Sequence, residues 1–331
     1  MKLFTLFLFA AAMAGAAAPC VTVSNCTDWV TFGGGPWRSM VYTTYPLATR
    51  NPQITRAFVM VHGTNRDADN YFRTSIAAAF LGSALDDTIV IAPHIASSAG
   101  SCHDPLAPNE VSWSCTGDSW RSGGTAVSTD RLTSFDFVDE LLRKLAKKDV
   151  FPNLKSIVVA GHSAGGQYVN RYSMANRIHE TLGVPITYVV ANPSSYAWLD
   201  DTRPTADNST FTPFAGADKC PNFDRWPYGL ENRTGGYTAK MSDDQLKKQL
   251  ASRPVTYLLG EIDILPLGGF DSSCSAMAQG PTRRARGEAF AKFVNQKIGA
   301  RHSMQIIHLC GHNARCMFTD EAALPLIFPK Q

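Results

Sequence analysis

Short runs of consecutive apolar residues recur along the chain and alternate with stretches of helical periodicity. The runs are apolar at nearly every position, which is typical of strands buried on both faces of a parallel sheet. The strongest strand candidates are residues 57–62, 88–92, 156–160, 186–191, 255–259 and 304–309. This alternation predicts an α/β fold with a mostly parallel central sheet and crossover helices on both faces.

Two segments between these runs have the apolar spacing of amphipathic helices. Residues 130–147 carry apolar side chains at helical intervals, with Ser and Asp near the start, and residues 281–298 form a similar late segment. The arginine cluster at 283–286 in the late segment predicts a solvated helix face. Residues 21–45 predict antiparallel edge strands, broken by the glycines and proline at 33–36.

Two long stretches depart from this alternation, at about 96–129 and 198–242. Long irregular segments in a compact domain are usually binding loops or lids. A chain of 331 residues allows one domain or two. Because it contains no internal repeat and no linker, we interpret residues 19–331 as a single α/β domain with loop insertions at these two places.

Residues 1–18 have the pattern of a signal peptide. A lysine at position 2 precedes an apolar run over 3–13, and small residues follow at 14–18, so cleavage after Ala16 or Ala18 is expected. The alternative, a membrane anchor, would need a longer apolar run than this one. The sequence therefore predicts an exported, extracellular protein that has no membrane association after cleavage.

The cysteines agree with export. An even number of cysteines in an exported chain predicts disulfides, although eight cysteines allow 105 connectivities. The simplest scheme pairs sequence neighbours: Cys20 with Cys26, Cys102 with Cys115, Cys220 with Cys274, and Cys310 with Cys316. No Cys-x-x-Cys spacing occurs, so no metal site is expected.

Charge and composition narrow the classes of partner. Hydrophobic residues make up 44% of the chain, charged residues 18%, and the formal net charge is +3 with scattered basic residues. Nucleic-acid binding is therefore not expected, and nothing in the sequence indicates a cofactor or an oligomeric state. Asn-x-Ser/Thr sequons predict surface positions and, in a eukaryotic host, glycosylation at Asn25, Asn208 and Asn232.

The main chemical signal is the sequence Gly-His-Ser-Ala-Gly at 161–165, directly after the strand candidate 156–160. A serine on a tight turn between a strand and a helix needs small neighbours, because both flanking segments pass close to it. The following residues can begin a helix, whose N-terminus stabilises developing negative charge. Ser163 is therefore the candidate nucleophile, the alternative being a glycine-rich turn with an incidental serine.

Through this turn, and through Val-His-Gly-Thr at 61–64 after an earlier strand, the sequence resembles the α/β-hydrolase family. The resemblance implies an oxyanion hole formed by the backbone N–H groups of Thr64 and Ala164. It also implies the chain order nucleophile, acid, histidine. We interpret His62 as a structural residue of its turn.

Asp263 is the candidate acid, because it follows the late strand 255–259. A turn-capping role for Asp263 is the alternative, and Glu261 and Asp271 are competing carboxylates. His312 is the candidate base: it begins the loop after the strand 304–309, whereas His308 lies within that strand. The remaining histidines are predicted to be structural or exposed: His94, His103, His179 and His302.

These roles predict a secreted serine hydrolase that cleaves a carboxylic ester, small or polymeric, through an acyl-enzyme. The chain is similar to secreted carboxylesterases such as the feruloyl esterase and polyhydroxyalkanoate depolymerase groups. A serine peptidase or amidase of the same fold is one alternative, and a non-catalytic binding protein on this scaffold is another. Aromatic residues in the long loops are candidates for the substrate pocket, with packing onto the core as the alternative: Trp113, Trp120, Tyr196, Trp198 and Trp226.

Overall fold

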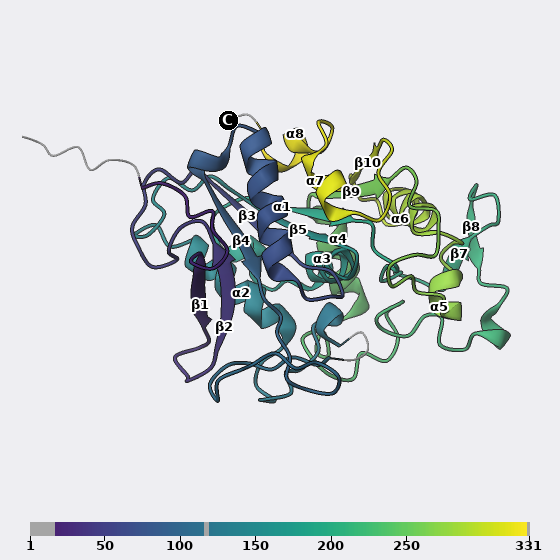
Figure 1. Cartoon of the computed structure of the whole chain (residues 1–331). Coiled ribbons are helices and arrows are strands. Elements are labelled where there is room, and N and C mark those ends of the chain that lie inside the picture. Colours follow the sequence, from purple (N-terminus) through teal and green to yellow (C-terminus); the bar gives the residue numbers. More distant parts are fainter. Residues whose placement is uncertain (1–16, 116–118, 330–331) are drawn as a thin grey trace, which may run out of the picture.

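A computed structural model describes residues 17–115 and 119–329, so all but the last two residues of the predicted signal peptide lie outside the described part. Its centre is an eight-stranded sheet with the order β1-β2-β4-β3-β5-β6-β9-β10 (Figure 1). Within this order, the strands from β4 to β10 pair in parallel, while β1 and β2 join one edge in antiparallel fashion. The predicted fold class is therefore confirmed.

The strand bounds lie within a few residues of the predicted runs. The main sheet contains β1 (Thr27–Thr31), β2 (Arg38–Thr43), β3 (Arg56–Val61), β4 (Thr88–Pro93), β5 (Ser156–His162), β6 (Ile186–Ala191), β9 (Val255–Gly260) and β10 (Ser303–Ile307). A separate two-stranded sheet, formed by β7 (Thr202–Pro204) and β8 (Phe211–Pro213), lies in the second long insertion.

Helices cover both faces of the sheet. The helices are α1 (Ala68–Leu81), α2 (Ser134–Leu145), α3 (Ala164–Ala175), α4 (Asp243–Ser252), α5 (Cys274–Met277), α6 (Arg283–Lys297), α7 (Ala314–Thr319) and α8 (Leu324–Ile327). Alternate residues of β3 enter opposite cores: Val59 belongs to the core that contains residues of α2, α3, α4 and α6, whereas Phe58 belongs to the core that contains residues of α1, α7 and α8. The sheet thus carries a hydrophobic core on each side, as runs of consecutive apolar residues require.

Helices α2 and α6 fall inside the segments that periodicity predicts, whereas α1 and α4 do not stand out in the sequence. The buried face of α1 consists largely of Ala, Ser and Thr around Tyr71 and Phe72, and α4 buries only Leu246 and Leu250. Neither helix has the broad stripe of large apolar side chains that makes an amphipathic pattern visible.

The prediction of a solvated arginine face on α6 is wrong for two of its three arginines. Arg283 and Arg286 have about 1% and 0% of their surface exposed, whereas Arg284 stays partly exposed. The guanidinium of Arg286 donates to the carbonyl oxygens of Ser194, Gly280 and Asp271. These side chains are buried because they satisfy carbonyl groups of irregular segments that have no sheet or helix partner.

Four disulfides are present, and they join the sequence neighbours: Cys20–Cys26, Cys102–Cys115, Cys220–Cys274 and Cys310–Cys316. Of the sequon asparagines, Asn25 and Asn232 are exposed, and Asn208 is half-buried in the turn between β7 and β8. Among the described residues, no helix has the length and apolar character needed to span a membrane.

Candidate active site

Ser163 lies at the turn between β5 and α3, as the last residue before the helix. Its backbone has φ 58° and ψ −119°, a conformation that is rare for residues other than glycine. The Ser163 N–H donates to Ala191 O, and its carbonyl accepts from the N–H of Gln167. The residue is 8% exposed and lines a cavity.

The glycines around Ser163 are required by close backbone contacts. A Cβ atom on Gly161 would lie 2.2 Å from Gly165 O, and one on Gly165 would lie 2.1 Å from Val61 O. A Cβ on Gly166 would lie 2.5 Å from Ala191 O. The glycines are therefore needed because β3 and β6 approach this turn closely. The alternative interpretation, a loose glycine-rich turn with an incidental serine, does not fit these contacts.

The structure brings Ser163, His312 and Asp263 into one hydrogen-bonded row. His312 Nε2 lies 2.9 Å from Ser163 Oγ, and His312 Nδ1 lies 2.8 Å from Asp263 Oδ2. With Nδ1 facing the carboxylate, the proton belongs on Nδ1, and Nε2 accepts from the serine hydroxyl. Asp263 is buried, and the His312 side chain is 13% exposed.

The competing candidates lie elsewhere. Glu261 and His308 pair with each other, with Glu261 Oε2 2.7 Å from His308 Nδ1, and the His308 side chain is 76% exposed. Asp271 accepts a hydrogen bond from the Tyr228 hydroxyl at 2.7 Å. Asp263 differs from both carboxylates because the turn after β9 directs it toward the loop after β10.

Asn192 joins the ends of three strands beneath the row, and sequence reasoning did not identify it. It follows β6 with φ 45°, its Oδ1 accepts from Gly260 N–H at 2.8 Å, and its Nδ2 donates to Gly311 O at 3.2 Å. The loops that carry Asp263 and His312 are thereby held to the strand next to β5. The Cys310–Cys316 disulfide closes the His312 loop as well.

The 63–64 turn lies against the serine, so that Thr64 lines the same cavity as Ser163 and His312. A Cβ on Gly63 would be 3.8 Å from Ser163 Cβ. Ala164 is the first residue of α3, and the first N–H groups of a helix have no intrahelical acceptor. Thr64 thus borders the cavity beside Ser163, and Ala164 begins the helix that follows the serine.

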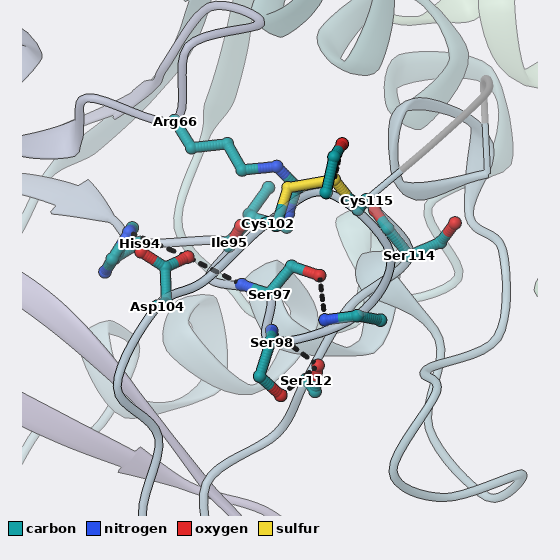
Figure 2. Close-up of a disulfide and its surroundings, with 12 residues drawn as sticks. Arg66, His94, Ile95, Ser97, Ser98, Cys102, Asp104, Ser112, Ser114 and Cys115 are labelled. Atoms are coloured by element: carbon teal, nitrogen blue, oxygen red, sulfur yellow. Dashed lines mark hydrogen bonds and ion pairs between the residues drawn. A yellow bond between two sulfur atoms is a disulfide. The ribbon is translucent and has the colours of Figure 1, made fainter.

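Arg66 fixes this turn to the disulfide loop, a contact that the sequence did not reveal. Its N–H donates to Gly63 O at 3.2 Å, and its buried guanidinium donates to Ile95 O at 2.6 Å and to Ser114 O. Figure 2 shows the Arg66 side chain reaching the segment that the Cys102–Cys115 disulfide closes. Because most arginines in folded proteins are exposed, an arginine close to the His-Gly turn does not by itself indicate such a contact.

Two histidines beside the row are neutral. Burial lowers the pKa of His62 to about 3, and its Nε2 accepts from Ile95 N–H, which fits a structural role in the turn. Burial, together with His312 and Arg283, lowers the pKa of His162, whose ring centroid lies 4.7 Å from that of His312. His312 is therefore the histidine placed to exchange a proton with Ser163.

A cavity of about 460 Å³ opens beside Ser163, and most of the residues that line it have polar side chains. Gly268 and Gly269 form one side: Cβ atoms there would be 3.2 Å from His312 Cδ2 and 3.6 Å from Thr64 Cγ2. Side chains from the α1 and α7 regions form the rest of the wall, among them Asn65, Asp67, Asn70, Tyr71, Thr74, Asn313 and Arg315.

The prediction that loop aromatics line this cavity is wrong. Trp113, Trp120, Tyr196 and Trp198 are at most 3% exposed and belong to the core on the α2, α3 and α6 side. Trp226 packs on the same core and borders a different cavity, next to Tyr228. These rings are buried because removing their large apolar surface from water stabilises the core, and the long insertions place them there.

The acid has a second partner, Arg283, at the first position of α6. Arg283 Nη1 lies 3.4 Å from Asp263 Oδ1, the oxygen that His312 does not use.

Among the described residues, no cluster of His, Cys, Asp or Glu has the geometry to hold a metal ion. The row of Ser163, His312 and Asp263 is thus an arrangement suited to nucleophilic attack on a carbonyl.

The fold agrees with these local features. The structure of poly(aspartic acid) hydrolase-1 from Sphingomonas sp. KT-1 is similar, with a TM-score of 0.64 and 22% identity over 91% of this chain and 97% of that one. The chain has an α/β-hydrolase fold.

A second structure with the hydrolase fold, a poly(3-hydroxybutyrate) depolymerase from Bordetella parapertussis, has a TM-score of 0.62 and 21% identity, covering 91% of this chain and 87% of that one. No protein-family model and no curated protein matches the sequence. Ser163 after β5, Asp263 after β9 and His312 after β10 follow the carboxyl ends of parallel strands, where ligands bind in open α/β sheets.

Proposed function

We propose that this protein is a secreted serine hydrolase that cleaves carboxylic esters. The observation that carries the proposal is the hydrogen-bonded row, with 2.9 Å between Ser163 Oγ and His312 Nε2 and 2.8 Å between His312 Nδ1 and Asp263 Oδ2. Export is supported by four disulfides, which are typical of proteins from oxidising compartments, and by the signal-peptide pattern.

In the proposed mechanism, Ser163 Oγ attacks the ester carbonyl carbon while His312 Nε2 takes the hydroxyl proton. The backbone N–H groups of Thr64 and Ala164 donate to the oxyanion. The C–O bond to the alcohol then breaks, and the alcohol leaves with the proton from His312. Water, deprotonated by His312, attacks the acyl-enzyme and releases the acid and Ser163. Asp263 holds the His312 tautomer and stabilises the imidazolium.

The first experiment tests the nucleophile. A fluorophosphonate probe is expected to label the wild-type protein at Ser163, located by peptide mass spectrometry. Ser163→Ala should abolish labelling and lower kcat by about 10⁴-fold or more, with an unchanged circular dichroism spectrum. Ser173→Ala serves as the matched control, because Ser173 is buried on α3 and its hydroxyl donates to Asn170 O; this variant should still be labelled at Ser163. Folded wild-type protein that the probe does not label would exclude this mechanism and favour a binding protein.

The second experiment tests the bond that is cleaved. A serine, a histidine and an oxyanion hole can catalyse the hydrolysis of esters and of amides. Of the two similar structures, one is named as a hydrolase of poly(aspartic acid), a polyamide, and the other as a depolymerase of poly(3-hydroxybutyrate), a polyester. A p-nitrophenyl ester and a peptide anilide should be assayed side by side. We expect turnover of the ester; turnover of the anilide alone would assign the protein to the peptidases or amidases.

The cavity wall suggests the preferred acyl group. Because the side chains around Ser163 are mostly polar and the loop aromatics are buried elsewhere, we expect higher kcat/KM for short acyl esters than for long acyl or feruloyl esters. A screen across short acyl, long acyl, feruloyl and polyester substrates measures this order. Preference for the feruloyl ester would show that a different surface receives the substrate.

Export has its own test. N-terminal sequencing of protein from the culture medium of an expressing host should begin after Ala16 or Ala18. A mature chain starting after Ala18 keeps Cys20, which bonds to Cys26 and whose N–H donates to Thr44 O beside the sheet edge. Retention of residues 1–18 on membrane-bound protein would contradict the prediction of a cleaved signal peptide.

A further inference from the structure

Arg283 contacts the acid of the candidate active site, and its other polar contacts are with Ser194 and with Gly268 at the cavity wall. Its side chain has 0% of its surface exposed. Nη1 lies 3.4 Å from Asp263 Oδ1, Nε donates to Ser194 Oγ at 2.7 Å, and Nη2 donates to Gly268 O at 2.8 Å. A guanidinium spreads its donors over a planar fork, so one side chain can hold three groups at once.

We infer that Arg283 is a positioning residue of the site, which fixes the Asp263 carboxylate and makes His312 a weaker base. This inference rests on the proposed function, since it concerns the same serine, histidine and acid. It has two parts, one geometric and one electrostatic, and each part has its own measurable consequence.

The geometric part follows from the two oxygens of Asp263. Oδ2 accepts from His312 and Oδ1 faces Arg283, so the plane of the carboxylate is fixed from both sides. Arg283 also holds Gly268, and a Cβ on Gly268 would lie 3.2 Å from His312 Cδ2. The acid and the cavity wall beside the base are therefore held by one side chain. Small displacements of such groups lower kcat strongly.

The electrostatic part follows from the charge of the pair. A buried carboxylate next to His312 favours the imidazolium form, and a buried cation in contact with that carboxylate offsets this effect. Tyr196 is neutral, because burial and the Asp263 charge raise its pKa. The Arg283 guanidinium supplies a cation in contact with the acid.

Other charged or titratable groups face His312 from the cavity side. They are His162, which burial keeps neutral, and the cavity-lining residues Asp67, Tyr71 and Arg315. Asp67, Tyr71 and Arg315 remain in place when Arg283 is replaced. Arg283 contributes to the lowered pKa of His162, but burial, the largest cause, is unchanged by the replacement.

The test is the pH dependence of kcat/KM, whose acidic limb reports the protonation of His312 in the free enzyme. In Arg283→Gln the Asp263 charge is no longer offset, the imidazolium is favoured, and the limb should move to higher pH by about one unit. At the pH optimum, kcat should fall by about tenfold to 10²-fold. A purely structural role would lower activity without moving the limb.

Arg284→Gln is the matched control. It removes the same charge one residue further along α6, but the Arg284 guanidinium binds Glu261 O and Glu288 and is partly exposed. In Arg284→Gln, the acidic limb of kcat/KM should stay within about 0.2 pH units of its wild-type position, because solvent screens exposed charges. A shift as large as that of Arg283→Gln would assign the effect to net charge and overturn the electrostatic part.

Arg283→Lys separates the two parts and replaces Arg283→Gln if that variant does not fold. The ammonium keeps the charge but cannot make three fork contacts, so the limb should stay near its wild-type position while kcat falls severalfold. Wild-type kcat in Arg283→Lys would overturn the geometric part, and a limb raised by about one unit would overturn the electrostatic part.

Failure of this inference is distinguishable from failure of the proposed function. Fluorophosphonate labelling of wild-type Ser163 establishes the function without reference to Arg283. If Ser163 is labelled and the limb of Arg283→Gln matches the wild type, only the role of Arg283 is excluded. If Ser163 is not labelled, the proposed function fails first.

Discussion

At the scale of single residues, the site depends on the close backbone contacts around the turn that carries Ser163. Ser163 keeps a left-handed backbone because the strand before it and the helix after it both hold the turn, and because no side chain fits at Gly161 or Gly165. Strain of this kind persists only where the surroundings determine the conformation, and it occurs frequently at active sites.

Gly165→Ala tests the crowding. The new Cβ would lie 2.1 Å from Val61 O, which belongs to a buried strand and cannot move away without breaking sheet hydrogen bonds. We expect destabilisation of about 3 kcal/mol or more and loss of fluorophosphonate labelling. Gly235→Ala is the control, because a Cβ there meets nothing within 4 Å. Equal melting temperatures for the two variants would show that the turn tolerates a side chain.

Asp263→Asn tests the choice of acid. The amide cannot hold the proton of His312 on Nδ1 as the carboxylate does, so kcat should fall by about 10⁴-fold. Glu261→Gln, which changes the competing carboxylate two residues away, should remain within a few-fold of the wild type because Glu261 pairs with exposed His308. Steady-state kinetics on one ester compares both variants, and a larger loss in Glu261→Gln would reverse the assignment.

At the scale of elements, α2 shows how a helix is placed by both local and tertiary contacts. Thr133 and Asp136 form a reciprocal capping box at its start, which the sequence carries by itself. In its middle, the buried Asp139 accepts hydrogen bonds from the hydroxyl groups of Tyr172 on α3 and Tyr237 in the second insertion. One carboxylate therefore joins α2, α3 and the long loop.

Asp139 predicts a pH-dependent term in stability. Burial raises its pKa from 3.8 to about 6, so the folded state binds this proton more tightly than the unfolded chain does. Its contribution is fully present below about pH 4 and is lost as the pH rises through about 6. The stability of Asp139→Asn relative to the wild type should therefore increase between pH 4 and pH 7, by up to about 3 kcal/mol.

Denaturant unfolding at several pH values measures this difference. Glu140→Gln, at the next position of α2 and partly exposed, is the control, and its difference from the wild type should vary little with pH. A difference for Asp139→Asn that is constant from pH 4 to pH 7 would contradict the raised pKa.

At the scale of the whole molecule, the disulfides connect segments of different separation. Cys20–Cys26 and Cys310–Cys316 each span 6 positions, whereas Cys220–Cys274 spans 54 and ties the second insertion to α5. In the chain-entropy model, a cross-link stabilises the folded state more when the loop it closes is longer.

The Cys220→Ser/Cys274→Ser double variant should accordingly lose about 4 kcal/mol of unfolding free energy, and Cys20→Ser/Cys26→Ser about 2 kcal/mol. Denaturant unfolding without reductant measures both. Labelling of Ser163 should survive in each folded variant, because neither disulfide lies in the hydrogen-bonded row. The reverse order of losses would show that native-state contacts near each bond outweigh loop length.

The resemblance to the α/β-hydrolase family supplied the chain order that selects Asp263 and His312 as candidates. Local pattern by itself determined the main strands, α2 and α6, the fold class and the turn that carries Ser163. It could do so because strands buried on both faces need continuous apolar runs, and a tight nucleophile turn needs glycines at fixed positions. The simplest cysteine scheme, which pairs sequence neighbours, agrees with the disulfides of the structure. These features depend on contacts between residues close in sequence or on one well-defined turn.

Only the tertiary structure decided which long-range partners complete the site. Arg283 and Arg286 have the sequence signature of a solvated helix face, yet they are buried because irregular segments far away supply carbonyl and carboxylate acceptors. Trp113 and Trp198 lie in long loops, yet they are buried in the core, because burying their large apolar surface there stabilises the fold more than lining a cavity would. Periodicity reports which residues avoid water, and it does not report which group compensates a buried charge or which core an aromatic ring enters.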